Sequence, residues 1–233
     1  MHTKTFEHKF EHKDLDYTFE DCPATTGTDG TRFYSTPDGH KYPSVTTVTG
    51  FEKKAFFAEW RKKNPRESRR VLNRGNRFHD TIEKYLQNDS VYLNNASPLD
   101  RILFEQIKPE LHKIDNIVAQ EVPLYSSLLG LAGRVDCVAD YDGKKSIIDF
   151  KGSTREKRKE DIDNYFMQAT AYAIMFHERT GIKIDNIVIL ISSEDGAVQS
   201  FVDNPIRYTK KLYNCIKKYK SIQTNDFSSV SSS

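Results

Sequence analysis

The 233-residue sequence contains only three cysteines, and no two of them form a Cys-x-x-Cys pair. Cys22, Cys137 and Cys215 are widely spaced, which argues against a structural zinc or iron–sulfur site and favours reduced thiols inside a cell. The chain also has no apolar run of transmembrane length, so no membrane partner is expected. A Gly-Lys-Thr phosphate loop is missing as well, which excludes a P-loop helicase.

The chain has no large excess of basic or acidic residues: 35 Lys and Arg residues and 33 Asp and Glu residues give a net charge of +2. The first residues have no apolar signal core, and six acidic residues within 1–21 are unlike a transit peptide. We therefore expect a cytoplasmic protein of a bacterium or of a phage-infected host cell. Basic residues are nevertheless concentrated in one segment: Arg61, Lys62, Lys63, Arg66, Arg69, Arg70, Arg74 and Arg77. This segment indicates either an ordinary solvated face or a surface that faces phosphates.

The most informative stretch is residues 130–151, where mostly apolar runs flank Tyr-Asp-Gly at 141–143. This pattern predicts two strands joined by a tight turn. Side chains two apart share a strand face, so Asp149 and Lys151 project together, with Asp136 of the first strand nearby. Two carboxylates and an ammonium on one face suit a divalent-metal site, because Mg²⁺ prefers oxygen ligands. The alternative at this point is an incidental grouping on a solvated hairpin.

Hydrophobic spacing predicts the remaining elements. In the first part of the chain we expect an edge strand at 17–20, a loop at 25–30, a hairpin at 32–42 and a helix entry at Ser44. We expect helices at 55–63, at 66–86, at 98–111 with Ile102 inward, at 161–179 with Asp161 as its cap, and from Pro205 onward. Further strands are expected at 117–124, 187–192 and 198–202. This order predicts an α/β fold with a mixed sheet flanked by helices. Residues 1–222 should form one domain, with 1–42 as a strand and hairpin extension, followed by a disordered Ser-rich tail at 223–233.

Gly133-Arg-Val-Asp136 followed by Ile147-Ile-Asp-Phe-Lys151 resembles the signature of PD-(D/E)xK nucleases in their RecB-like form. Two further family features occur in order, a helical His upstream at His79 and Gln-x-x-x-Tyr at 168–172. Tyr42-Pro-Ser-Val-Thr-Thr-Val is similar to the mitochondrial genome maintenance exonucleases and their phage relatives. The resemblance covers about residues 42–192 and implies the restriction-endonuclease-like version of the α/β fold.

The resemblance also implies a site. Its catalytic residues would be Asp136, Asp149 and Lys151, and its ligands for Mg²⁺ (or Mn²⁺) would be Asp136, Asp149, the Phe150 carbonyl, His79 and Glu121. Its substrate-binding residues would be Gln168 and Tyr172. Independently of the resemblance, the charge pattern adds Arg74 and Arg77 of the basic segment and Arg155 of a charged loop at 152–160. The residues alone leave alternatives open, because His79 lies on an apolar stripe typical of core residues. Glu121, Gln168 and Tyr172 suit exposed strand and helix surfaces equally well, and the loop with Arg155 suits a mobile, solvated segment.

These features predict a metal-dependent DNA exonuclease that hydrolyses phosphodiester bonds from free ends of single-stranded DNA. One alternative is a nuclease-like domain that binds nucleic acid or protein without cleavage. Another is an endonuclease specific for a DNA structure or sequence. The presence of Asp136, Asp149 and Lys151 favours cleavage, because non-cleaving relatives tend to lose one of the three.

Overall fold

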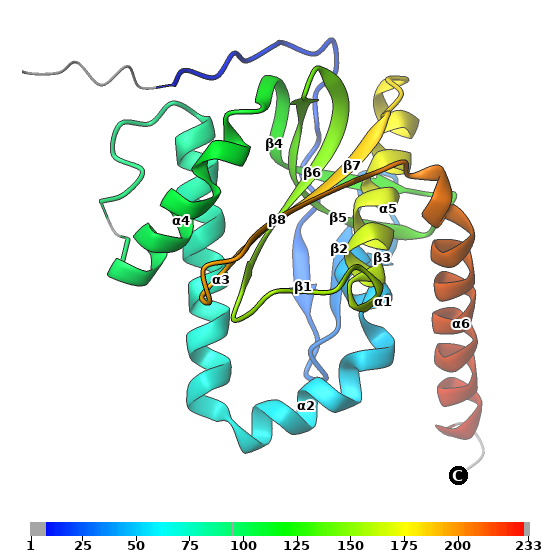
Figure 1. Cartoon of the computed structure of the whole chain (residues 1–233). Helices are drawn as coiled ribbons and strands as arrows, with labels where there is room; N and C mark the ends of the chain where they lie inside the picture. The colour runs from blue at the N-terminus through cyan, green and yellow to red at the C-terminus, as the bar shows by residue number, and fades with distance from the viewer. Residues whose placement is uncertain (1–7, 95, 231–233) are drawn as a thin grey trace, which may run out of the picture.

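A five-stranded mixed sheet forms the centre of the protein in the computed structural model, which describes residues 8–94 and 96–230 (Figure 1). The strand order is β4-β5-β6-β7-β8, and only β6 and β7 are parallel neighbours. The strands are β4 (Ile114–Ser126), β5 (Leu131–Tyr141), β6 (Lys144–Ser153), β7 (Asn186–Ser193) and β8 (Val198–Asp203). The predicted α/β fold with a mixed sheet flanked by helices is confirmed.

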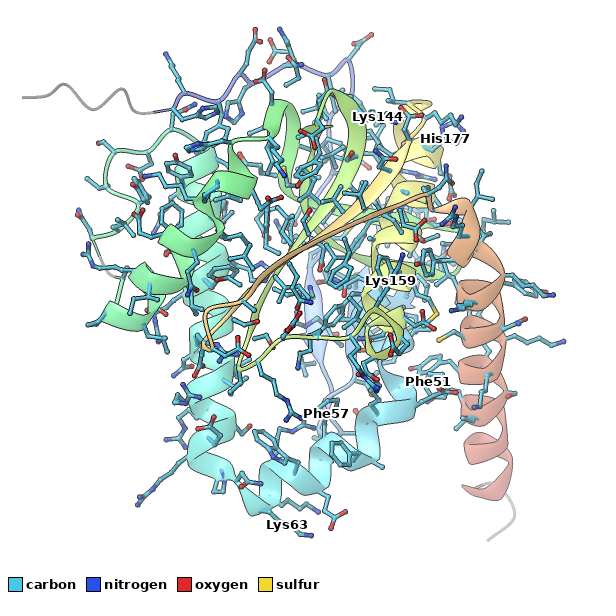
Figure 2. All side chains as sticks on the ribbon, viewed as in Figure 1. Phe51, Phe57, Lys63, Lys144, Lys159 and His177 are labelled. Carbon is cyan, nitrogen blue, oxygen red and sulfur yellow. The ribbon has the colours of Figure 1, made fainter. Side chains whose placement is uncertain are left out.

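Helices cover both faces of this sheet, and side chains fill the space between the layers (Figure 2). Ile147 and Ile189 pack in the cluster with α5, whereas Ile148 and Leu190 pack in the cluster with α3 and α4, because neighbouring strand residues point to opposite faces. The first layer consists of α1 (Val45–Thr49), α5 (Asp163–Thr180) and α6 (Ile206–Val230), and the second of α3 (Pro65–Leu86) and α4 (Pro98–Leu111). Helix α5 forms the crossover between parallel strands β6 and β7.

A small antiparallel sheet precedes the central sheet and consists of β1 (Ala24–Thr26), β2 (Arg32–Ser35) and β3 (Lys41–Pro43). Its β2–β3 hairpin is the one predicted from the sequence. Ser44 caps α1 as expected, since its Oγ accepts a hydrogen bond from the Thr47 N–H at 3.0 Å. A bridge between Ser44 and Ala132 of β5 joins this region to the central sheet. That contact supports our proposal that residues 1–222 form one domain, of which 1–7 lie outside the described part.

Helix α2 (Lys54–Lys63) follows a 3₁₀ turn, η1 (Phe51–Lys53), and runs between α1 and α3 without burying any of its residues (Figure 1). The predicted division between helices at 55–63 and 66–86 is confirmed, because α2 ends at Lys63 and α3 begins at Pro65. Proline suits a first helical position, where its missing N–H would have no partner in the helix. The chain therefore leaves the sheet layers at α2 and returns with α3.

Several local predictions are wrong. Residues 17–20 form no strand, and Thr25 and Thr26 belong to β1 and not to a loop. Asp161 does not cap α5; it lies in a 3₁₀ turn, η2 (Lys159–Asp161), and pairs with Arg158. Ile102 is 55% exposed, because the inward stripe of α4 consists of residues 103, 104, 107 and 111. Helix α6 runs to Val230, into the tail predicted to be disordered, whereas residues 231–233 lie outside the described residues.

Candidate active site

The central sheet opens between β5 and β6. Their paired residues run from Tyr141 and Lys144 to Cys137 and Ile148. Beyond this point β5 stays paired with β4, and β6 stays paired with β7. The N–H of Phe150 donates a hydrogen bond to Oδ2 of Asp136 at 3.0 Å across the opening. The Asp136 carboxylate therefore lies where the two strands separate.

Three side chains from different elements meet at this opening. One ligand atom each of His79, Glu121 and Asp136 lies within 4.8 Å of the others. His79 reaches the cluster from α3, and its Nδ1 lies 3.4 Å from Oδ2 of Asp136. Glu121 comes from β4 and lies opposite Asp136, because the flanking residue pairs are 120 with 137 and 122 with 135. Three of the five predicted metal ligands are thus together.

Glu121 is held in an unusual environment. Its φ is +48°, in the left-handed region that non-glycine residues seldom adopt. Burial, and then the negative charges of Asp136 and Glu83, raise the pKa of Glu121 to about 7. A cation among these carboxylates would remove the repulsion between them. Glu83 was not predicted from the sequence, although it lies four residues after His79 and therefore on the same side of the helix.

Asp149 lies beside this cluster and is almost fully buried. Its Oδ1 accepts hydrogen bonds from Nζ of Lys151 at 2.7 Å and from Nε2 of Gln168 at 3.1 Å. Its Oδ2 is buried and has no hydrogen-bond partner within the described part of the chain. Burial raises the pKa of Asp149, although the positive charge of Lys151 opposes the rise. A buried carboxylate oxygen without a partner is costly, so Asp149 fits the role of a metal ligand.

Lys151 remains an ammonium in this setting. Burial alone would lower the pKa of Lys151, but the attraction of Asp149 and Asp136 outweighs burial and leaves that pKa raised. Its Nζ also lies 5.3 Å from the centroid of the Tyr165 ring, a cation–π distance that no sequence pattern indicates. Lys151 is therefore a charged donor next to the carboxylates.

Gln168 and Tyr172 are buried, so the alternative of an ordinary helix surface is wrong. Gln168 fixes the Asp149 carboxylate through the bond described above. The Tyr172 hydroxyl lies against Gly133, where an added Cβ would come within 2.6 Å of it. The glycine of the Gly-x-x-Asp motif is thus required by a close approach. Whether both residues also contact substrate stays a prediction.

The cluster opens into a cleft of about 940 Å³. Seven predicted or newly found functional residues line it: His79, Glu83, Glu121, Asp136, Lys151, Gln168 and Tyr172. Asp149 does not line the cleft, but it accepts hydrogen bonds from Lys151 and Gln168, which do line it. The Phe150 carbonyl stays a predicted ligand, since the contact seen here uses the Phe150 N–H.

Two predicted phosphate-binding arginines have structural partners. Arg74 is 2% exposed and forms an ion pair with Glu194, so the prediction that it lies on a free, phosphate-facing surface is wrong. Arg77 donates from Nε to the buried Asp100 of α4 at 2.6 Å. These ion pairs fasten α3 to the β7–β8 turn and to α4. Arg155 is exposed, which fits both a contact with nucleic acid and the alternative of a solvated loop, so its role stays a prediction.

A family model described as the PD-(D/E)XK nuclease superfamily matches residues 96–214, just over half of the chain. The chain belongs to the PD-(D/E)XK nuclease superfamily. The matched part includes the two strand aspartates, Lys151 and Gln168, whereas His79 precedes it.

Two curated relatives are similar to this chain over part of their length. The human protein named mitochondrial genome maintenance exonuclease 1 is 29% identical over 174 residues, which cover 68% of this chain and 50% of the relative. The mouse protein of the same name is 27% identical over 205 residues, which cover 78% of this chain and 60% of the relative. The chain thus spans about half to three fifths of the length of these relatives.

Two solved structures align with the fold at low sequence identity. A proposed exonuclease from Eubacterium rectale gives a TM-score of 0.45 at 13% identity and covers 64% of each chain. The structure of SSO0001 gives a TM-score of 0.37 at 16% identity, and the match covers 75% of this chain and 74% of that chain.

Among the helices within residues 8–94 and 96–230, none has the length and apolar character that a membrane span requires.

Proposed function

We propose that this protein is a metal-dependent exonuclease that hydrolyses phosphodiester bonds from free ends of single-stranded DNA. The observation that carries the proposal is the meeting of His79, Glu121 and Asp136 within 4.8 Å, beside a buried Asp149 whose Oδ2 has no partner among the described residues. Membership of a nuclease superfamily supports the reaction class. The names of the human and mouse relatives support the exonuclease mode.

The donor set fits a divalent ion such as Mg²⁺ or Mn²⁺. Carboxylate oxygens suit both ions, and one imidazole in the set favours Mn²⁺ over Mg²⁺. Asp136, Glu121 and His79 would hold the ion from the cleft, and Asp149 would hold it from the buried side. A bound divalent ion makes a coordinated water acidic and neutralises charge on a phosphoryl oxygen.

Lys151 and Gln168 supply the orientation that the reaction needs. Lys151 offers N–H donors beside the carboxylates, so it can position the attacking water and offset the charge that develops on the phosphoryl group. Gln168 holds Asp149 in one orientation, as outer-shell partners do in metal sites. Both side chains therefore act next to the scissile phosphate.

Preference for single strands rests on α2 and the beginning of α3. This region combines basic residues with aromatic rings at the surface, since Phe57 is 45% exposed and Trp60 is half-buried. Lysine and arginine follow a phosphate backbone, and aromatic rings stack on unpaired bases of any sequence. Affinity for DNA should therefore fall steeply as salt rises, because released counterions contribute to binding.

The test compares linear and circular single-stranded DNA of equal length, each with Mg²⁺, with Mn²⁺ and with EDTA. We expect nucleotide release from the linear strand in the presence of metal, and an intact circle. Rapid cleavage of the circle would replace the exonuclease proposal by the endonuclease alternative. Binding of both substrates without any cleavage would favour a nuclease-like domain that only binds.

A further inference from the structure

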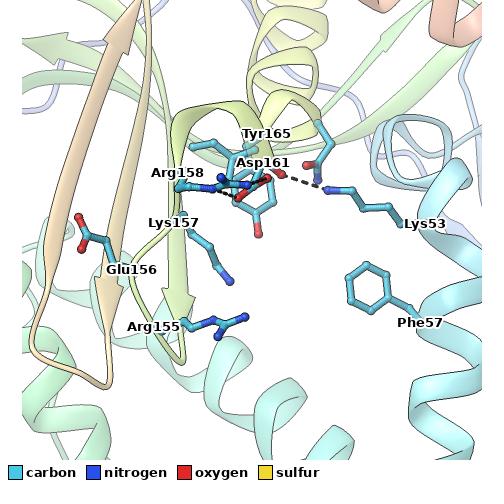
Figure 3. Close-up of a pocket in the computed structure, with 10 residues that line it drawn as sticks. Lys53, Phe57, Arg155, Glu156, Lys157, Arg158, Asp161 and Tyr165 are labelled. Atoms are coloured by element: carbon cyan, nitrogen blue, oxygen red, sulfur yellow. Dashed lines mark hydrogen bonds and ion pairs between the residues drawn. The ribbon is translucent and has the colours of Figure 1, made fainter.

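A second hollow lies close to the candidate active site, between α2 and the loop that follows β6 (Figure 3). Its volume is about 670 Å³, within the range of pockets that enclose small organic ligands. Six of its lining residues matter here: Lys53, Phe57, Arg155, Lys157, Arg158 and Tyr165. In Figure 3 the ring of Phe57 faces Arg155 and Lys157 across the opening.

Positive charge dominates this hollow. Arg158 is neutralised by Asp161, with 2.8 Å between Nε and Oδ2. Glu156 bonds Gln199 at 3.4 Å and points away from the opening in Figure 3. Arg155 and Lys157, by contrast, have no carboxylate within 4.0 Å among the residues that the structure describes. Burial and then the positive charge of Arg155 lower the pKa of Lys157, so an anion between the two side chains would relieve their repulsion.

The hollow is linked to the active site indirectly, through one ring contact and a third hollow. Tyr165 lines it, and the same ring lies 5.3 Å from Nζ of Lys151. A smaller hollow of about 380 Å³ shares Lys53 and Phe57 with it. That smaller hollow also shares Arg32 and Thr46 with the active-site cleft. The linings of the three hollows therefore follow one another from the cleft to Arg155 and Lys157.

We propose that this second hollow is a nucleotide-binding subsite for the strand that the active site cleaves. Arg155 and Lys157 bind a backbone phosphate there, and the ring of Phe57 stacks on the unpaired base of the same nucleotide. Two cations without carboxylate partners supply the phosphate contact, and an aromatic ring opposite them supplies a sequence-tolerant stacking surface. The assignment rests on the proposed function, because it names where a second nucleotide of that substrate binds.

The test measures binding of the full chain to a fluorescent oligothymidylate about 12 nucleotides long, in EDTA so that no strand is cut. Phe57→Ala should weaken binding about tenfold, whereas Phe56→Ala should change it less than about twofold. Phe56 is the matched control, because it is an adjacent exposed phenylalanine that does not line the hollow. Equal losses for the two variants would overturn the subsite.

Salt dependence provides a second readout. The Arg155→Gln/Lys157→Gln variant should lower the slope of log affinity against log salt by about 0.7, the value for one phosphate of a single strand. Lys210→Gln/Lys217→Gln removes the same charge from the exposed side of α6 and should leave the slope unchanged. If wild-type protein binds and trims linear DNA while the hollow variants match this control, only the subsite is wrong. If wild-type protein binds no single-stranded DNA, the proposed function fails as well.

Discussion

The carboxylate of Asp136 accepts a hydrogen bond from the Phe150 N–H at 3.0 Å, across the opening between β5 and β6. The same oxygen lies 3.4 Å from Nδ1 of His79 on α3. One carboxylate oxygen therefore links two strands and a helix at the candidate site. Because one of these contacts uses the backbone, the position of Asp136 is tied to the sheet and not only to its own rotamer.

His79 should affect catalysis more than folding. Its side chain is 30% exposed and faces the cleft, so the alternative of a core histidine is not supported. We expect His79→Ala to reduce DNA cleavage about 10-fold or more with little change in melting temperature. Cleavage rate and thermal unfolding measured on the same samples check this, with His177→Ala as an exposed control. A variant that unfolds readily but cleaves normally when folded would restore the core assignment.

Gln168 should act through Asp149. Gln168→Leu keeps the approximate size of the side chain and removes the N–H that bonds Asp149. We expect a loss of about 10- to 100-fold in Mn²⁺ affinity or in cleavage, the range typical of partners that orient metal ligands. Calorimetric Mn²⁺ titration and cleavage assays measure both, and Met167→Leu on the same helix is the control. Unchanged values in both assays would show that Asp149 needs no such support.

Gly133 and Tyr172 should be energetically coupled. Gly133→Ala places a methyl group 2.6 Å from the Tyr172 hydroxyl, so we expect a loss of about 1–3 kcal/mol in unfolding free energy. The loss should be smaller in a Tyr172→Phe background, which removes the oxygen. Urea unfolding of the wild type, Gly133→Ala, Tyr172→Phe and the double variant measures the coupling. Gly75→Ala on α3 is the control, because nothing lies within 4 Å of its added Cβ and alanine favours the helix.

Stability should fall at acidic pH partly through His112. Burial, and then the positive charges of His8 and Lys108, lower the pKa of His112, so the folded protein binds a proton at this ring less readily than the unfolded chain does. As the pH falls below about 6.5, the pKa of this histidine in the unfolded chain, the unfolded chain binds a proton that the folded protein binds less readily. Protonation therefore favours the unfolded chain, and the free energy of unfolding decreases as the pH falls. His112→Gln should therefore lose less melting temperature than wild type between about pH 7 and pH 5. An equal decrease would contradict this account, and His177→Gln should follow wild type.

Much of the site was predictable because its signals are local. Strand alternation predicts that Asp149 and Lys151 share a face, and the turn at 141–143 brings their strand back beside Asp136. The spacing of Gln168 and Tyr172 places both on one helix face, and the structure shows that face against the sheet. These patterns join residues that are close in the sequence, and the structure has the same arrangement.

The remaining features depend on contacts between distant residues. The ion pair of Arg74 with Glu194 joins residues 120 positions apart, so a basic helix pattern could not show that Arg74 is buried. The meeting of Lys53 and Phe57 with the loop at 154–158 likewise depends on where α2 lies. The positive φ of Glu121 and the partial burial that raises its pKa depend on the fold around it, and the residue type does not indicate them.

The most direct test of the metal-site assignment is cleavage of end-labelled single-stranded DNA by Asp136→Asn with Mn²⁺ or Mg²⁺. Asp142→Asn in the same hairpin is the matched control, because Asp142 lies in the turn at positive φ, which Asn also tolerates. We predict that Asp136→Asn folds normally by circular dichroism but loses about 100-fold or more of the cleavage rate, whereas the control keeps it. Wild-type turnover by a folded Asp136→Asn protein would contradict the assignment.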